Sequence, residues 1–188
     1  MPQFLFFPFY GPNRRSDLPV IELRLRFSDS EADSFPEASE ETVRALKSAG
    51  VLEDKDASPA DNLPDSRPVR YMDLLTLTAL RLQQRAGHQV AFRSLLEYHH
   101  DGRVTALVEH EDPATGMAAV KFASQLVSHP DKVTSAAIES FSRQAGSRSL
   151  AGETRAIIAA LRRRNIPFLH GDRARLAVAY CADASWRQ

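Results

Sequence analysis

The sequence is poor in several residue types that build common functional sites. It contains a single cysteine, Cys181, which excludes an internal disulfide and any zinc site made from several cysteines. A lone cysteine is more often a small apolar core residue than a nucleophile, so we interpret Cys181 as part of a buried strand. The eight glycines form neither G-x-G-x-x-G nor G-x-x-x-x-G-K-[ST]. No phosphate-binding loop can be recognised, and no cofactor is expected.

Net charge and long apolar runs are also lacking. Lysine plus arginine and aspartate plus glutamate number 24 each, so no overall charge draws the chain to nucleic acid or to an anionic membrane. The apolar start, MPQFLFFPFY, is too short and too interrupted by proline to span a membrane, and no basic segment precedes it as in a secretory signal. The sequence therefore predicts a cytoplasmic protein that binds neither nucleic acid nor membranes.

The hydrophobic pattern predicts strands in pairs, with helices between them. Apolar and polar residues alternate from Pro19 to Phe27, which is typical of a half-buried strand, and turn residues join it to an aromatic strand over Gln3–Phe9. A second pair is predicted over Gln89–Glu97 and Arg103–Glu111, with Asp-Gly in the turn. Helices are predicted over 40–48, 72–87, 115–128, 131–144 and 152–164, and a last strand pair over 166–169 and 175–181.

These elements predict an α+β fold with a mixed, largely antiparallel sheet packed against helices. The length suits a single domain over residues 1–188. Residues 52–69 contain three prolines and several Asp and Ser residues, so we expect a flexible loop there within the domain.

Several groups of residues follow one another in the order found in a known domain. They are Gly11-Pro12-Asn13 with the strand that follows, Ala79-Leu80 to Gly87, Glu109-His110-Glu111 with Gly116, and Thr154 to Pro167. With their flanks they cover roughly four fifths of the chain, and they resemble the N-terminal domain of cyanophycin synthetases. In that family an ATP-grasp domain and a Mur-ligase-like domain follow and form amide bonds. The 188 residues contain neither, so the resemblance implies a stand-alone homologue.

The helix predicted over 72–87 departs from the family at the positions that matter for chemistry. Family members often have an H-x-x-E-H arrangement there, whereas this chain has Asp73, Thr76, Leu77 and Arg81 on and beside the same helix face. Leucine cannot bind a metal, threonine does not replace the acid that activates water, and arginine repels a cation. We therefore predict no catalytic residue and no metal site, with Asp73 and His110 as the fallback metal ligands.

The candidate ligand-binding residues are polar groups on the predicted strands. Glu109 and Glu111 are two apart on one strand and so face the same side. Such a pair could bind an arginine side chain through bidentate hydrogen bonds, or simply form a solvated edge of the sheet. Together with the positions that match the family, the candidates are Asn13, Glu22, Arg24, Arg93, Glu109 and Glu111.

Three functional hypotheses follow. The preferred one is a non-catalytic accessory or substrate-binding protein that works with a separately encoded ATP-grasp or Mur-ligase-type amide ligase in peptide or amino-acid polymer biosynthesis. Its expected partners are that enzyme and a peptide or polymer containing Asp and Arg. The second is a divergent metal-dependent hydrolase of amide or isopeptide bonds, with ligands among Asp73, His88, Glu109, His110 and Glu111. The third is a self-contained module for a basic peptide. The resemblance also implies possible homo-oligomers.

Overall fold

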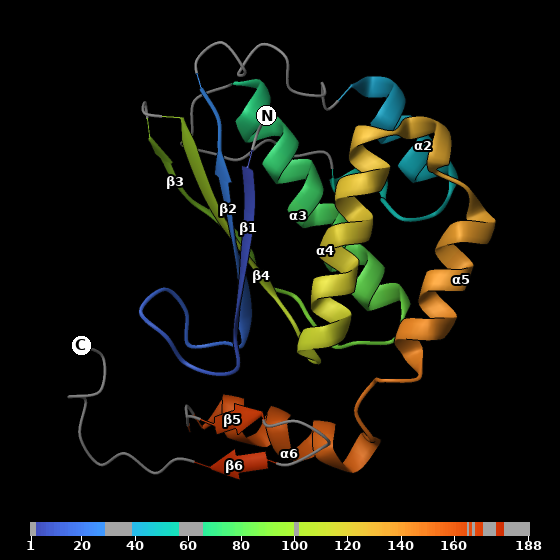
Figure 1. Cartoon of the computed structure of the whole chain (residues 1–188). Coiled ribbons are helices and arrows are strands. Elements are labelled where there is room, and N and C mark those ends of the chain that lie inside the picture. The colour runs from blue at the N-terminus through green and yellow to red at the C-terminus, as the bar shows by residue number, and fades with distance from the viewer. Residues whose placement is uncertain are drawn as a thin grey trace.

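The computed structural model describes residues 3–28, 39–56, 66–99, 102–164, 166, 168–170 and 176–178. Within these ranges the chain has an α+β fold in which helices cover one face of an antiparallel sheet (Figure 1). This confirms the predicted fold class. Cys181 and the central residues 57–65 of the predicted loop lie outside the described ranges.

The main sheet has four strands, all paired antiparallel, in the order β1-β2-β4-β3. Their bounds are β1 Gln3–Phe9, β2 Val20–Arg26, β3 Arg93–His99 and β4 Arg103–Glu109. Both predicted hairpins are confirmed, because β1 pairs with β2 and β3 pairs with β4. The contact between β2 and β4 joins the two hairpins into one sheet.

Strand β3 begins at Arg93, four residues later than predicted. The amides of Ala91 and Phe92 donate instead to one carboxylate oxygen of Glu109, at 2.8 and 2.9 Å. Those two amides are therefore not available for hydrogen bonds to a neighbouring strand. The carbonyl of Phe92 still accepts a backbone hydrogen bond from Glu109 at 2.9 Å.

Five helices lie in the described ranges, with a 3-10 turn before α3 and another before α5: α2 Glu40–Ser48, η1 Asp54–Asp56, α3 Arg67–Arg85, α4 Pro113–Ser128, η2 Pro130–Lys132, α5 Ser135–Gly146 and α6 Gly152–Arg163. Helix α3 begins earlier than predicted because Pro68 suits a first helical turn, where no N–H donor is needed. The last three residues of the predicted 52–69 loop are thus helical. Helix α5 begins at Ser135, later than predicted, because the Thr134 side chain caps it.

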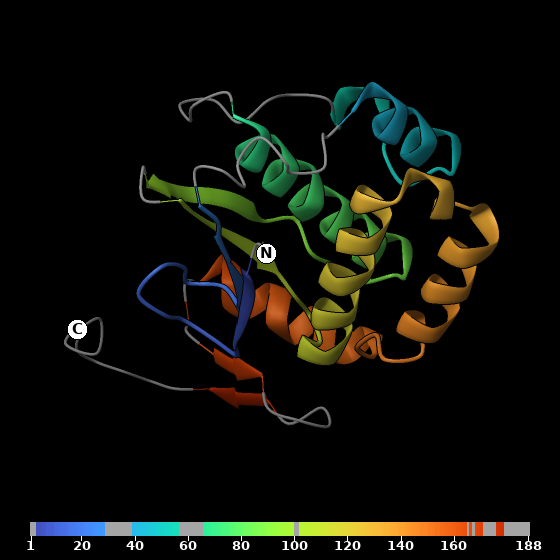
Figure 2. The same cartoon turned by 45° about the horizontal axis from the view of Figure 1, so that its top comes forward.

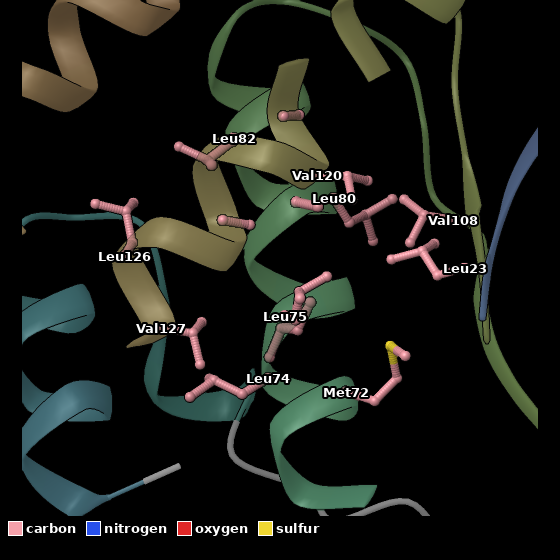
Figure 3. Close-up of a cluster of buried hydrophobic side chains, with 14 of the residues drawn as sticks. Leu23, Met72, Leu74, Leu75, Leu80, Leu82, Val108, Val120, Leu126 and Val127 are labelled. Atoms are coloured by element: carbon pink, nitrogen blue, oxygen red, sulfur yellow. The ribbon is translucent and has the colours of Figure 1, made fainter. Parts of the chain in front are cut away.

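Helix α3 forms the centre of the core, between the sheet and α4 (Figure 3). Most of its side chains are buried, as expected for a helix covered by other elements on several sides; they include Met72, Leu74, Leu75, Leu77, Ala79, Leu80 and Leu82. Gly116 lets α4 approach β2 closely, since a Cβ there would lie 2.8 Å from Cδ1 of Ile21.

The C-terminal elements lie apart from this core. Strands β5 Phe168–His170 and β6 Leu176–Val178 form a separate antiparallel pair, as predicted. Figures 1 and 2 show this pair near the end of the main sheet where β1 leads into β2. No helix in the described part of the chain has the length and apolar character needed to cross a membrane.

Candidate functional site

Asp73 and Arg81 lie at α3 positions compared above with the family's metal ligands. Their side chains attach the helix to its neighbours. Asp73 forms an ion pair with Arg93 of β3, and Arg81 binds both carboxylate oxygens of Asp56, with Nε to Oδ2 at 3.0 Å. The hydrogen bond with Asp56 raises the pKa of Arg81 above its usual value. Leu77 is buried. This face therefore joins α3 to β3 and to η1.

Thr76, at the position where the resemblance leads us to expect an acid, is also engaged within the helix. Its hydroxyl donates to the carbonyl of Asp73 at 3.0 Å, and the residue is fully buried. A hydroxyl that donates to its own helix has its proton committed to the backbone. It does not act as a water-activating group in this arrangement.

The two predicted carboxylates, Glu109 and Glu111, point toward the same segment of chain, residues 89–92. Glu109 accepts the amides of Ala91 and Phe92, and Glu111 accepts the amide of Gln89 at 2.7 Å. Glu109 is 1% exposed, and the side chain of Glu111 is 7% exposed. Both side chains therefore hold backbone in place beneath the surface.

Glu111 also connects the start of α6 to the rest of the fold. Its Oε1 atom accepts the amide of Leu150 at 2.8 Å and lies 3.4 Å from Nε of Arg155. Arg155 in turn donates to the carbonyl of Gly87 at 2.9 Å. One carboxylate thus links the end of α3, the end of β4 and α6.

The two histidines among the ligands of the hydrolase hypothesis, one of which is the fallback metal ligand His110, have backbone partners. His88 places Nε2 3.2 Å from the carbonyl of Ala145, and His110 places Nε2 3.1 Å from the carbonyl of Phe9. A carbonyl only accepts, so Nε2 carries the proton in both rings. His110 contacts the carbonyl of Phe9, whereas Asp73 pairs with Arg93. The described residues form no group of three or more His, Cys, Asp or Glu that could hold a metal ion.

The face of the sheet opposite α3 brings together another set of predicted residues. Arg24 donates from Nε to Glu22 at 2.5 Å, and its guanidinium carbon lies 4.6 Å from the centre of the Phe7 ring. Glu22 is buried, whereas the side chain of Arg24 is 42% exposed. The carboxylate and the ring therefore hold the arginine at the surface in a defined position.

Asn13 shapes the loop that crosses this face. Its Oδ1 atom accepts the amides of Arg15 at 2.8 Å and Ser16 at 3.0 Å. The loop places Arg15 against Glu97 of β3, at 2.5 Å. The bond to Glu97 and the nearby charge of Glu22 together raise the pKa of Arg15, against the opposing effect of desolvation.

The predicted ligand-binding residues thus fall into three places. Glu22 and Arg24 lie together on the sheet face opposite α3, with Asn13 in the loop that crosses it; Glu109 and Glu111 hold residues 89–92, and Arg93 lies on the helix side. Sequence reasoning missed Arg26 and Arg103, which are exposed and pair directly across β2 and β4. The alternation in β2 puts Arg26 on the polar face, but only the strand register brings Arg103 to it.

In comparisons with known proteins, no family model matches the sequence, and no curated protein matches it significantly. The resemblance to cyanophycin synthetases therefore stays a prediction from the residues quoted above.

Proposed function

We propose that this chain is a non-catalytic accessory or substrate-binding protein that works with a separately encoded ATP-grasp or Mur-ligase-type amide ligase. In this proposal it acts in the cytoplasm, in the synthesis of a peptide or amino-acid polymer. It contributes binding and positioning, while the ligase supplies the ATP-dependent chemistry.

One observation carries the proposal: the positions that hold chemistry in the resembling family are used here for structural contacts. Asp73 is paired with Arg93, Arg81 with Asp56, and Leu77 is part of the core. A metal site needs several converging donors and an open coordination position. Side chains committed to ion pairs and packing support a scaffold that presents a surface to other molecules.

A ligand or partner would meet the sheet face opposite α3 rather than the buried carboxylates. Phe7 is 37% exposed, and the side chains of Arg15 and Glu97 are 36% and 37% exposed. Glu109 and Glu111 are buried against backbone amides. This distribution supports ligand contact through β1, β2 and the loop between them, with Arg24, whose side chain is 42% exposed, closest to the ligand among the predicted residues.

Co-expression with an ATP-grasp or Mur-type ligase from the same genome, followed by size-exclusion chromatography, tests the proposal. We expect the two proteins to elute together, and the ligase to form amide bonds faster with the chain than without it. The variant Arg24→Gln should weaken this effect, whereas Arg44→Gln, an exposed arginine on α2, should not. Separate elution together with an unchanged ligase rate would contradict the proposal.

A further inference from the structure

The two edge strands of the main sheet, β1 and β3, differ in how far they are protected against pairing with another chain (Figure 1). Strand β3 carries the charged residues Arg93 and Glu97, and its register shifts between Leu95 and Glu97. Charges and bulges on an edge strand hinder the addition of a further strand. Strand β1 has no charged residue, and its pairing with β2 is regular throughout. Its outer side therefore lacks both of these protecting features.

Hydrogen bonds at the two ends of β2 show which backbone groups of β1 face outward. The amide of His110 donates to the carbonyl of Pro19 at 3.1 Å, and the amide of Phe27 donates to the carbonyl of Gly102 at 2.8 Å. Because bonded and non-bonded pairs alternate along antiparallel strands, odd-numbered residues of β2 bond to β4 and even-numbered ones bond to β1. In the register of β1 with β2, even-numbered residues of β2 oppose odd-numbered residues of β1. The backbone groups of the even-numbered residues of β1 therefore point away from β2.

The outward-facing residues of β1 are Phe4, Phe6 and Pro8. Proline has no N–H group, and it suits a position where no donor toward the neighbouring strand is needed. Phe4 and Phe6 each direct one N–H and one C=O group to the outer side, where no described residue pairs with them. Such groups on an edge strand are a template for another strand.

We propose that two copies of this chain pair through β1, with the strands antiparallel about a two-fold axis at Leu5. This register opposes Phe4 of each copy to Phe6 of the other, so every outward N–H and C=O group of both residues pairs. An axis at Phe6 would oppose Phe4 to Pro8, whose missing N–H leaves the carbonyl of Phe4 without a donor. The edge is thus self-complementary in one register, as a two-fold interface requires. The inference goes beyond the proposed function, because this pairing requires neither a ligand nor a ligase.

The side chains of β1 also support a second copy as the partner. The Phe4 and Phe6 rings stack on each other with centroids 6.2 Å apart, and both are partly buried against the core. In the proposed pair, Phe4 of one copy and Phe6 of the other are direct cross-strand neighbours on the same face, where aromatic pairs stabilise a sheet. The hydrophobic core of each copy then continues into the other.

Charge does not oppose this pairing. The net charge of the chain is zero, so two copies do not repel each other at long range. Strand β1 has no charged residue, and the first charged positions lie on β2. The two β2 backbones would be three strand spacings apart, about 14 Å, which exceeds the Debye length of about 8 Å in physiological salt. A charged peptide would find no opposite charge on β1, whereas an uncharged aromatic strand matches it.

Sedimentation velocity of the full-length protein tests this inference. A contact limited to one strand edge is small, so we expect a dimer with a dissociation constant of roughly 10 μM. The variant Leu5→Glu opposes two carboxylates across the axis, while each still lies opposite Arg24 of its own chain. It should weaken dimerisation at least about tenfold. Ile157→Glu, at a residue of α6 that is 51% exposed, is the control and should dimerise like the wild type.

Mixing two variants locates the axis. Leu5→Lys should also weaken self-association, because it opposes two ammonium groups, whereas an equal mixture of Leu5→Glu and Leu5→Lys should form dimers through the opposite charges. Melting temperatures of each variant alone show whether it is folded. Amide exchange of the wild type, followed by NMR, requires no variant: the amides of Phe4 and Phe6 should exchange more slowly at high protein concentration than at low concentration.

Several results would overturn the inference. They are a wild type that stays monomeric, amides of Phe4 and Phe6 whose exchange does not depend on concentration, a Leu5→Glu variant that dimerises like the wild type, and a mixture of folded variants that forms no dimer. So would a monomer that binds an uncharged peptide of alternating threonine and valine, because that result assigns the edge to a strand of another protein.

Discussion

Replacing Gly102 with alanine is expected to lower the free energy of unfolding by about 3 kcal/mol or more. Gly102 lies in the turn between β3 and β4 with φ of 81°, a conformation that strains any residue with a Cβ atom. The new Cβ would also lie 1.7 Å from the carbonyl oxygen of Phe27. Because the amide of Phe27 donates to the carbonyl of Gly102 at 2.8 Å, neither backbone can move away without losing that bond.

Gly87→Ala provides the matched control. Gly87 has φ of 89°, but a Cβ there would meet nothing within 4 Å. This variant should show the conformational strain alone, about 1 kcal/mol. Urea unfolding followed by circular dichroism measures both variants. Equal losses of stability would contradict the close contact between the β3–β4 turn and the end of β2.

The variant Glu109→Gln should lose about 2 to 3 kcal/mol of stability. One carboxylate oxygen of Glu109 accepts two backbone amides beneath the surface, and the uncharged amide oxygen of glutamine would accept them more weakly. Glu139→Gln, on the exposed side of α5, is the control and should stay within about 0.5 kcal/mol of the wild type.

The same measurement separates a structural role for Glu109 from a role in ligand binding. A carboxylate kept for function is often unfavourable for stability, so its removal leaves the fold equally stable or makes it more stable. If Glu109→Gln unfolds at the same urea concentration as the wild type, the structural assignment of Glu109 is wrong. Gln89 to Phe92 would then be held by other contacts.

The secondary structure could be predicted from the sequence where local signals are strong. The alternation from Pro19 to Phe27 predicted β2, and Gly50 at the helix end predicted α2 over Glu40–Ser48. Local signals failed at β3, where the side chain of Glu109 takes amides that would otherwise join the ladder. That contact joins residues far apart in the sequence, so no local pattern could reveal it.

The candidate site was predictable only in part, for the same reason. Residue type and spacing indicated that Glu109 and Glu111 face one side, and both do reach residues 89–92. Their partners are backbone amides, which every residue carries and which leave no mark in the sequence. The opposition of Arg26 and Arg103 depends on the register between β2 and β4, and register between non-consecutive strands is set by the packed core.

The central claim, that the fold uses its charged residues for structure and surface binding rather than for catalysis, is tested most directly by metal analysis with a hydrolysis assay. The protein is purified without chelators, its zinc content is measured by mass spectrometry, and it is incubated with an aspartyl-arginine dipeptide. We predict no stoichiometric zinc and no cleavage, for the wild type and for Asp73→Asn alike. One zinc ion per chain together with cleavage, both lost in Asp73→Asn, would contradict the account and favour a hydrolase.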